Sequence, residues 1–470
     1  MLKPLLSCWP DRNCQNPNVK RAYQRRMDDS NSGAPNLDTN QGELVPTNRS
    51  SSRPGDNTNR MNNTRAPDTA WKRTLSSLKF REFRFLWLGM LLLMTGMQMQ
   101  MVVRSYLAYE ITSSPFLLGV VNAGFAIPLL VLSLFGGAIA DRLERKKIIQ
   151  IGQLVAVILS TFIGVSIATN SITWMHLLGV SMAQGALFSF LMPARQAMIP
   201  QLVGKENLTN AMSLDAAAMS ATTLIAPAIG GGLYNVIGPE GVYYLISGCG
   251  ILAIVFTSMV QSPDGVKAST ETAMLGDIKS GLSYVAHSRM VLVLLILGLL
   301  TTLLANPFRF IMPVFVVDLY GLGPESMGLL VTITGLGALV GSLSIASIGK
   351  WHRGSLLLAS CLVSGVALLM VASIPFYIAA TLIMIPVGLG DSVRWTLNQA
   401  MIMEEVADEY RGRVMSIFMM IFGMIPLGVL PAGLLAETVN GQFAVGLLAA
   451  LLLIVTFILW ASQKQLRNYM

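Results

Sequence analysis

Long apolar segments follow one another along most of this chain, from residue 84 to residue 461. A helix of about 20 apolar residues crosses a hydrocarbon layer about 30 Å thick, and each segment is about that long. A backbone surrounded by lipid must satisfy its own hydrogen bonds, so we expect each segment to be a helix. The sequence predicts twelve such spans, at 84–109, 115–140, 147–169, 172–194, 209–237, 240–261, 290–318, 323–348, 354–373, 376–400, 412–437 and 440–461.

The composition agrees with a membrane protein. Of the 470 residues, 53% are apolar and only 12% are charged, and the mean hydropathy is +0.59. Soluble domains are nearer about 25% charged. This balance excludes a secreted disulfide scaffold, a disordered chain and an ordinary cytosolic enzyme. The sequence therefore predicts an all-helical, multi-pass membrane protein.

Positive charge is concentrated on one side of the predicted spans. Of the 33 Lys and Arg residues, 23 follow residue 70, and all but Arg104, Arg309 and Arg394 fall on the side shared by the two termini. The loops on the opposite side contain acidic residues but no Lys or Arg. The positive-inside rule therefore places both termini in the cytoplasm of a cell (inner or plasma) membrane. The net charge of +8 is explained in this way without a nucleic-acid partner.

An internal repeat divides the spans into two sets of six. Residues 196–214 and 399–417 match at eight of nineteen positions, and each segment links the fourth predicted span of its half to the fifth. This is a parallel repeat, an arrangement that places a substrate cavity between two rocking halves. We predict four parts: a disordered polar tail at 1–70, a six-helix bundle with an amphipathic lead-in at 71–261, a cytoplasmic loop at 262–289 and a second six-helix bundle at 290–470.

The loop between the second and third spans, GGAIADRLERKK, resembles a loop motif of the major facilitator superfamily. A small residue there lets two helices approach closely, and an acid beside a base makes a charge-assisted latch. A positive loop without a special role is the plainer alternative. The resemblance assigns a cytoplasmic gate to five residues: Gly137, Asp141, Arg142, Arg145 and Lys146.

The fifth span contains LIAPAIGGGL, which resembles the antiporter motif of the same superfamily. Pro227, Gly230 and Gly231 match that motif. A proline and small residues allow a bend and close helix packing. Ordinary small-residue packing without a transport role is the alternative.

Four further segments resemble the enterobactin-exporter-like (transmembrane secretion effector) branch of the superfamily. They are FREFRFLWLG, AYEITSSP, PARQAMIPQLVGKENLTNAMSL and DEYRGRVMSI. The resemblance covers residues 76–461 and implies the twelve-helix fold and secondary transport. Members of this branch export siderophores, macrolides or other small amphipathic compounds, and related proteins move lysophospholipids.

Charged and polar residues inside the spans are the candidates for function, because intramembrane charge is costly. Arg394 follows Asp391 at i+3, so the two side chains can pair on one helix. We predict proton-coupling sites at Asp391 and Asp215. The alternatives are a structural ion pair for Asp391 and interfacial solvation for Asp215. The predicted substrate-cavity residues are Arg104, Arg309, Arg394 and Gln100, with snorkelling toward the interface as the alternative for Arg104.

Residue patterns typical of enzymes are nearly absent from the sequence. The three histidines lie far apart, the four cysteines have no zinc or redox spacing, and no nucleotide-binding GK[ST] loop is present. We therefore predict no catalytic residue, no metal, no bound nucleotide and no cofactor. The expected energy source is the proton gradient.

We predict a monomeric, proton-coupled exporter of small amphipathic molecules that works by alternating access. A lysophospholipid or lipid flippase on the same fold is the first alternative. A non-transporting sensor or scaffold that uses the 1–70 tail is the second.

Overall fold

The computed structural model describes residues 76–133, 144–261, 283–348, 352–467 and 469. The predicted 1–70 tail, most of the predicted 262–289 loop, and the gate residues Gly137, Asp141 and Arg142 lie outside the described residues. Pro67–Met470 forms one compact unit, and only this unit is considered below.

Every regular element in the described ranges is a helix. In chain order these are η1 (Ser76–Lys79), α3 (Arg81–Thr112), α4 (Pro115–Ala123), α6 (Arg145–Ala168), α7 (Trp174–Ser258), α9 (Arg289–Leu304), α10 (Pro307–Val314), η2 (Phe315–Leu319), α11 (Pro324–Ile348), α12 (Arg353–Ser373), α13 (Tyr377–Glu405), η3 (Asp408–Tyr410), α14 (Arg411–Gly423), α15 (Pro426–Thr438), α16 (Gly441–Ser462) and α17 (Lys464–Arg467).

The long helix α7 is interrupted at two glycines. Gly204 and Gly238 have φ values of 71° and 73° with non-helical ψ values. Only glycine adopts this conformation at little cost, and Pro239, directly after Gly238, suits the first turn of a new helix. The element therefore consists of three helical stretches, 174–203, 205–237 and 239–258.

The described residues contain 11 helices that are long and apolar enough to cross a membrane. Ten of the predicted spans correspond to one such helix each. The predicted spans 209–237 and 240–261 both fall largely within a single 53-residue stretch, Glu206–Ser258. The prediction of an all-helical, multi-pass chain is therefore confirmed.

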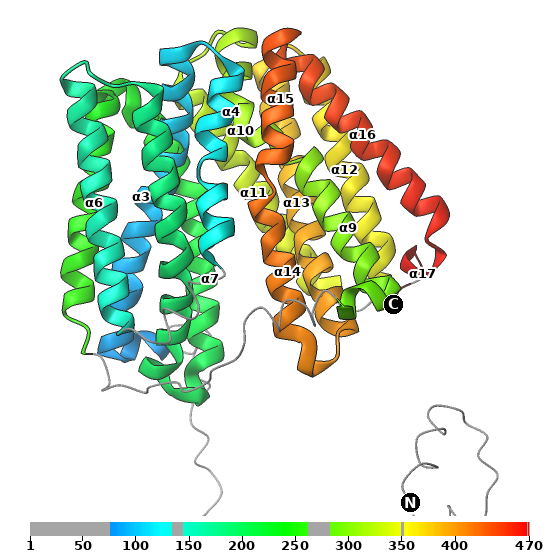
Figure 1. The fold of residues 1–470 in the computed structure, drawn as a ribbon, viewed down its shortest axis with the longest axis horizontal. Coiled ribbons are helices and arrows are strands. Elements are labelled where there is room, and N and C mark those ends of the chain that lie inside the picture. Colours follow the sequence, from blue (N-terminus) through cyan, green and yellow to red (C-terminus); the bar gives the residue numbers. More distant parts are fainter. Residues whose placement is uncertain (1–75, 134–143, 262–282, 349–351, 468, 470) are drawn as a thin grey trace, which may run out of the picture. The chain divides into compact units, whose positions relative to one another are not determined.

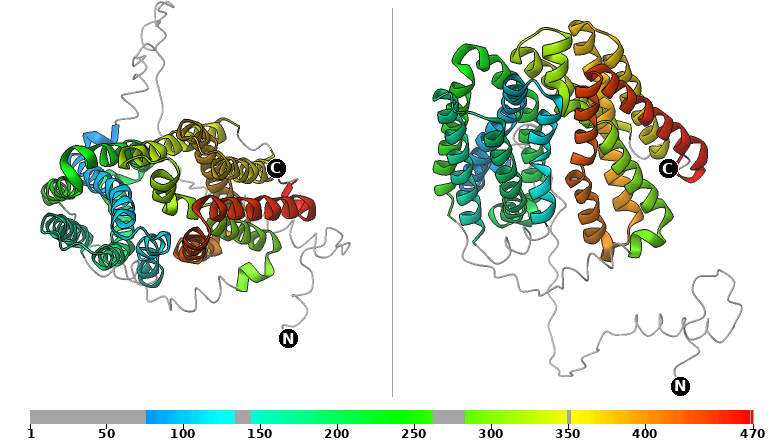
Figure 2. Two further views of the ribbon diagram at one scale, coloured as in Figure 1. Left: turned by 90° about the horizontal axis from the view of Figure 1, so that it is seen from above. Right: turned by 45° about the horizontal axis from the view of Figure 1, so that its top comes forward.

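The helices form two groups, which we call the N-half (residues 76–261) and the C-half (residues 283–467). In the N-half, α3 and α6 pack against α7, and in the C-half α11 and α12 pack against α13. The end-on view in Figure 2 shows the two groups side by side. We call the lower end of the bundle in Figure 1 the inner end and the upper end the outer end.

The two halves share a hydrophobic core at the outer end but not at the inner end. One buried cluster draws residues from both halves, for example Val103 and Tyr243 with Val316 and Leu368. A second cluster belongs to the C-half alone and a third to the N-half alone. The helices α7 and α11, and α4 and α15, join the halves.

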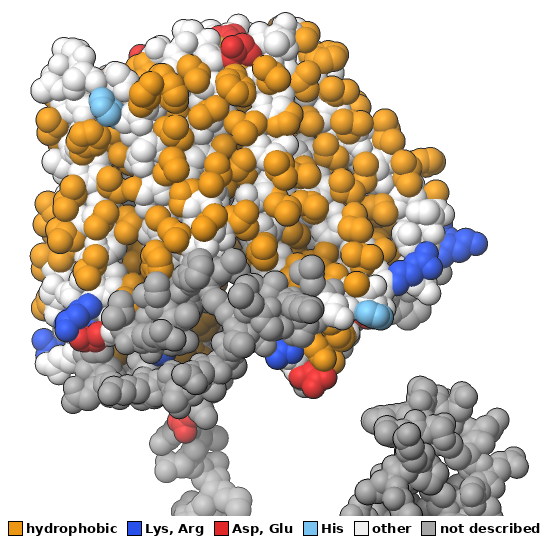
Figure 3. Space-filling model, in the orientation of Figure 1, with side chains coloured by type: hydrophobic (Ala, Val, Ile, Leu, Met, Phe, Trp, Pro, Cys, Tyr) orange, Lys and Arg blue, Asp and Glu red, His pale blue; other side chains and the backbone are white. Residues whose placement is uncertain are grey.

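The outer surface of the bundle carries large exposed apolar side chains, among them Val236, Ile378 and Phe457. Figure 3 shows hydrophobic side chains over the middle of the face in view, with the charged side chains near its upper and lower edges. A surface of this kind is stable in lipid and would aggregate in water. It agrees with the membrane location of the helices.

The two repeated segments occupy turns between helices. Residues 196–214 run across the non-helical Gly204 of α7, and residues 399–417 run from the end of α13 through η3 into α14. The eight matching positions therefore lie at structurally similar places.

Candidate functional site

A cavity of about 690 Å³ lies between the halves. Its N-half wall comes from Met219, Ser220 and Thr223 on α7, and its C-half wall comes from α9, α10, α11, α13 and α14. Sites for small molecules are typically about 300–1,000 Å³. We call this space the central cavity.

Three charged residues predicted from the sequence line the central cavity: Asp391, Arg394 and Arg309. Asp391 lies at the midpoint of α13, and its carboxylate accepts a hydrogen bond from Arg394 Nη2 at 3.0 Å. The predicted i,i+3 pair is therefore present. The Asp391 side chain is 34% exposed, whereas that of Arg394 is only 8% exposed, so the carboxylate is the more accessible member of the pair.

Arg309 on α10 is exposed to the central cavity. It forms no ion pair among the residues that the structure describes. The described lining thus holds one carboxylate against two guanidinium groups, so the cavity has an excess of positive charge.

The C-half also supplies an aromatic wall. The ring of Trp395 lies 4.8 Å from the ring of Phe418 and 4.8 Å from that of Phe422, measured between centroids. All three residues line the central cavity. The cavity therefore offers an apolar aromatic surface beside the charged groups, which suits an amphipathic molecule.

A side chamber of about 110 Å³ adjoins the central cavity and shares Asn306, Arg309 and Asp391 with it. Its other walls are mostly apolar and include Phe308, Met312, Val331, Met384 and Val387. Methionine side chains adapt to ligands of different shape. An apolar arm of a ligand can occupy this chamber while a polar group contacts Arg309.

The outer end is closed by hydrogen bonds between the halves. Tyr109 Oη donates to Asp318 at 2.5 Å, and Ser114 Oγ donates to Glu437 at 2.5 Å. Asn122 Nδ2 donates to the carbonyl of Phe310 at 3.1 Å. Asn235 also bonds Glu325 across the same boundary. The central cavity is therefore separated from the outer end by a polar seal above a shared apolar core.

The predicted packing motif of the fifth span lies in this seal. A Cβ atom on Gly231 would collide with the carbonyl oxygen of Pro324 and lie 3.1 Å from the Cα of Gly328. A Cβ atom on Gly328 would in turn lie 2.5 Å from the carbonyl oxygen of Pro227. Gly230 packs against the backbone of Met99. The two halves thus meet backbone to backbone at Gly231 and Gly328, whereas Gly230 packs within the N-half.

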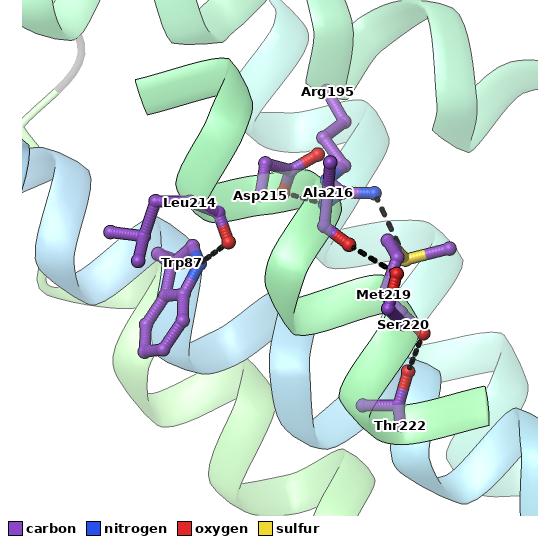
Figure 4. A network of polar contacts seen from close by, with 8 residues as sticks. All are labelled: Trp87, Arg195, Leu214, Asp215, Ala216, Met219, Ser220 and Thr222. Carbon is purple, nitrogen blue, oxygen red and sulfur yellow. Dashed lines mark hydrogen bonds and ion pairs between the residues drawn. The ribbon is translucent and has the colours of Figure 1, made fainter. Parts of the chain in front are cut away.

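Asp215, the second predicted proton site, does not line the central cavity. It forms an ion pair with Arg195, and Figure 4 shows the Arg195 guanidinium between Asp215 and Met219. The two side chains are only 6% and 16% exposed. The pair links the first and second stretches of α7 across Gly204 and lies behind Met219, a cavity residue.

We expect the Arg195–Asp215 pair to stabilise the N-half. Removing one partner of a buried pair leaves an uncompensated charge, which costs about 3–5 kcal/mol. Arg195→Gln and Asp215→Asn should each lower the thermal unfolding midpoint of the purified protein. The double variant Arg195→Gln/Asp215→Asn should recover much of the loss. Equal destabilisation by the double and single variants would contradict this.

The two described residues of the predicted gate motif bind within the N-half. Arg145 Nη1 donates to the carbonyl of Ala197 at 2.9 Å. Lys146 Nζ donates to the carbonyl of Val260 at 2.6 Å and to that of Ser258 at 3.0 Å. Ser258 is the last residue of α7, where a cation is stabilised by the helix dipole. Arg145 therefore ties the start of α6 to the first stretch of α7, and Lys146 ties it to the inner end of the third stretch.

Arg104 and Gln100 lie away from the central cavity. Both are buried inside the N-half, with exposed fractions of 5% and 2%. Arg104 Nη1 donates to Gln184 Oε1 at 2.9 Å. The structure thus separates these two predicted cavity residues from Arg309 and Arg394.

Sequence reasoning missed several cavity residues, among them Asn306, Trp395 and Asn398. It also counted Arg195 among the loop charges, whereas this residue is buried in α7. The internal repeat could have pointed to two of the cavity positions. Its offset of 203 aligns Arg195 with Asn398 and Asp215 with Phe418. The positions that hold an ion pair in the N-half thus line the cavity in the C-half.

Comparison with protein families gives a match to the Major Facilitator Superfamily over residues 86–431. The chain is also similar to curated proteins along most of their length. It is 24% identical to macrolide efflux protein A of Streptococcus pyogenes, with 76% of this chain and 90% of that protein covered. It is 24% identical to the staphyloferrin A transporter of Staphylococcus aureus, with 74% of this chain and 88% of that protein covered.

A third relative is the multidrug efflux pump Tap of Mycolicibacterium fortuitum, at 25% identity over 66% of this chain and 78% of that protein. Among solved structures, the nucleoside transporter NupG matches 81% of this chain with a TM-score of 0.67 and 14% identity, and 99% of NupG is covered. A D-xylose-proton symporter matches 81% of this chain with a TM-score of 0.65 and 14% identity, and 97% of that chain is covered. These two structures support the fold alone.

Proposed function

The chain belongs to the Major Facilitator Superfamily, and from this premise we propose that it is a proton-coupled exporter of small amphipathic molecules. It is a multi-pass membrane transporter with efflux-type relatives, and transporters of this family act on small molecules in a membrane. The observation that carries the proposal is the central cavity, which both halves line and which is sealed at the outer end.

We propose that the fold has twelve crossings. The stretch Glu206–Ser258 has 53 residues, and at 1.5 Å per residue it would extend about 80 Å as one helix, more than twice the hydrocarbon thickness. The break at Gly238 supports two crossings. The halves are then the six-helix bundles predicted at 71–261 and 290–470. The charge asymmetry supports a cytoplasmic position for both termini in a cell (inner or plasma) membrane.

With that orientation, the sealed outer end corresponds to an inward-facing state. Transport then requires the halves to rock, so that the outer contacts break and the inner ends close. The gate residues Gly137, Asp141, Arg142, Arg145 and Lys146 act at the inner end in this scheme. The contacts of Arg145 and Lys146 with α7 support a role in keeping the N-half rigid while it moves.

We assign proton coupling to Asp391. Export driven by inward proton flow requires that proton and substrate displace each other from the cavity. Asp391 is the carboxylate among the described lining residues, and it is exposed to the cavity. As a carboxylate it accepts a hydrogen bond from a hydroxyl or ammonium group of the substrate. Once protonated it loses that charged contact, so proton binding favours substrate release.

The cavity surface supports substrates with three features: a hydrogen-bond donor for Asp391, an anionic or acceptor group for Arg309, and an apolar body for the aromatic wall and side chamber. Macrolide-like drugs and siderophores are candidate classes, in keeping with the names of the relatives and with the enterobactin-exporter-like branch. These relatives do not favour the lipid flippase alternative.

The test is accumulation of dyes, macrolides and catecholate siderophores in cells that lack their own efflux pumps. We expect cells producing this protein to accumulate less of at least one compound, because export competes with entry. Dissipating the proton gradient with an uncoupler should remove the difference. The control is a variant with Gly231→Leu, which we expect to insert into the membrane but to close its outer end only rarely.

Unchanged accumulation across the panel would argue against export of this cargo class. A difference that survives the uncoupler would argue against proton coupling while leaving transport intact. The monomeric state that we propose is checked separately, from the mass of the purified protein in detergent.

A further inference from the structure

The side chamber is a recess in the apolar core that the two halves share at the outer end. Its walls come mainly from α10, α11 and α13 of the C-half, and the N-half contributes Thr223. Several of its lining residues belong to the shared core and are at most 5% exposed: Ala305, Phe308, Met312, Val331, Met384 and Val387. A ligand group in the chamber is therefore surrounded by core side chains.

The mouth of the chamber is polar on one side and small on the other. The residues that line both the chamber and the central cavity mark this boundary, and they include Asn306, Arg309 and Asp391 as well as Gly335 and Ala338. The backbone N–H of Arg309 donates to the carbonyl of Asn306 at 3.1 Å, so these two residues belong to one turn. A ligand group at the mouth meets donors on Arg309 and Asn306 and an acceptor on Asp391.

The interior of the chamber is apolar. Thr334 has the only side-chain hydroxyl among the residues that line the chamber but not the central cavity. This hydroxyl already donates to the carbonyl of Leu330 at 2.7 Å. Apolar cavities remain free of ordered water and bind apolar groups. An apolar arm that enters the chamber therefore displaces no hydrogen-bonded partner.

The size of the chamber limits the arm that it can hold. Its volume is about 110 Å³, and an apolar cavity of about 150 Å³ in another protein binds benzene. A single six-membered ring or a branched alkyl group fits a space of this order. A fused ring system or a long acyl chain does not fit while its polar group stays at the mouth.

We propose that the side chamber is a size-selective pocket, and that the cargo carries a single ring or a branched alkyl group attached close to a polar group. The inference rests on the proposed function, because it takes the ligand to be transported cargo. Met384 is the specificity-determining residue. Its side chain is 0% exposed and lines the chamber but not the central cavity, so its volume sets the space left for the arm.

Binding of a graded ligand series to the purified, full-length protein in detergent tests this. The probes are the amides of alanine, leucine, phenylalanine and naphthylalanine, each with a fluorescent dansyl group on its amino nitrogen. The dansyl group is a fused ring and is the same in all four. We expect the leucine and phenylalanine probes to bind at least about tenfold more tightly than the alanine probe, because their arms are buried. The naphthylalanine probe should lose this gain.

Two variants and a matched control locate the pocket. Met384→Ala enlarges the chamber, so the naphthylalanine probe should bind about tenfold more tightly than to the wild type. Ala338→Leu narrows the mouth without changing a core side chain, so the leucine and phenylalanine probes should bind no better than the alanine probe. Met401→Ala is the control, because Met401 also lies on α13 and is 0% exposed but lines neither cavity. It should keep the wild-type order of affinities.

Equal affinity across the series, or affinity that still rises from phenylalanine to naphthylalanine in the wild type, would overturn the proposal. An identical response of Met384→Ala and Met401→Ala would overturn it too, because general loosening of the C-half would then explain the gain. If Met384→Ala does not fold, unchanged preference in Ala338→Leu has the same meaning. The series needs no proton gradient. Size preference without uncoupler-sensitive export would reject the transport function and leave the pocket in place, and export without size preference would do the reverse.

Discussion

Asp391→Asn is expected to reduce uncoupler-sensitive export about tenfold, while exchange of substrate across the membrane continues. Coupling free energies between two ligands are typically about 1–3 kcal/mol, or roughly 5- to 150-fold. Asparagine resembles the protonated carboxyl in shape and charge. The variant therefore mimics the protonated state of Asp391 permanently and cannot release a proton. The measurement is gradient-driven export from proteoliposomes beside substrate counterflow without a gradient.

The ion pair with Arg394 complicates this variant, because Asp391→Asn leaves the buried Arg394 without its partner. The double variant Asp391→Asn/Arg394→Gln removes both charges and separates loss of coupling from loss of stability. Asp391→Glu keeps the carboxylate and should retain gradient-driven export. Asp215→Asn is the control at a carboxylate outside the central cavity. Any decrease in export in this variant should be proportional to its decrease in folded protein.

Gradient-driven export at the wild-type rate in both Asp391→Asn and the double variant would remove Asp391 as the coupling site. Export lost together with counterflow would instead make Asp391 a residue needed for substrate binding. The two assays therefore distinguish a proton site from a binding site at the same carboxylate.

Most of the helices could be predicted from the sequence because helices depend on local properties. Apolar length and the lipid environment require helices. The charges mark their ends only roughly, because the helix predicted to end at residue 194 continues through Arg195 to residue 203. The Asp391–Arg394 pair could be predicted for the same reason, because i,i+3 neighbours meet on any helix. Its exposure to a cavity required the structure.

Contacts between distant parts of the chain could not be predicted in this way. The charge count treated Arg195 as a cytoplasmic loop residue, although it is buried against Asp215, 20 positions later. Arg104 was predicted to be a substrate-cavity residue because a charge inside a span is costly and usually functional, yet it is buried inside the N-half. The rotation of α3 about its axis decides which side chains face inward, and the weak amphipathicity of an apolar helix does not encode that rotation.

Gly231→Leu is expected to abolish most transport without preventing membrane insertion. In the structure the Gly231 backbone contacts Pro324 and Gly328 of the C-half, and a side chain has no space there. Overpacking a close contact costs about 1–3 kcal/mol, which shifts a two-state equilibrium by roughly 5- to 150-fold. The outer end should therefore stay open, and the inward-facing state should become rare.

Gly232→Leu is the matched control. It is the next residue on the same helix, and a Cβ atom there meets nothing within 4 Å. This variant should transport normally. Gly328→Leu, on the opposite side of the contact, faces the carbonyl of Pro227 and should reproduce the effect of Gly231→Leu.

The state of the cavity can be read independently of transport. Ser342 lines the central cavity, so a cysteine at this position, in a background without the four native cysteines, reports access from the inner side. We expect Gly231→Leu to slow its labelling by a thiol reagent supplied at that side, and Gly232→Leu to leave the rate unchanged. Slower labelling with lost transport would mean that backbone contact at the outer seal is required for the inward-facing state. Normal labelling with lost transport would place the defect in the outward-facing state, because the seal would then close despite the larger side chain.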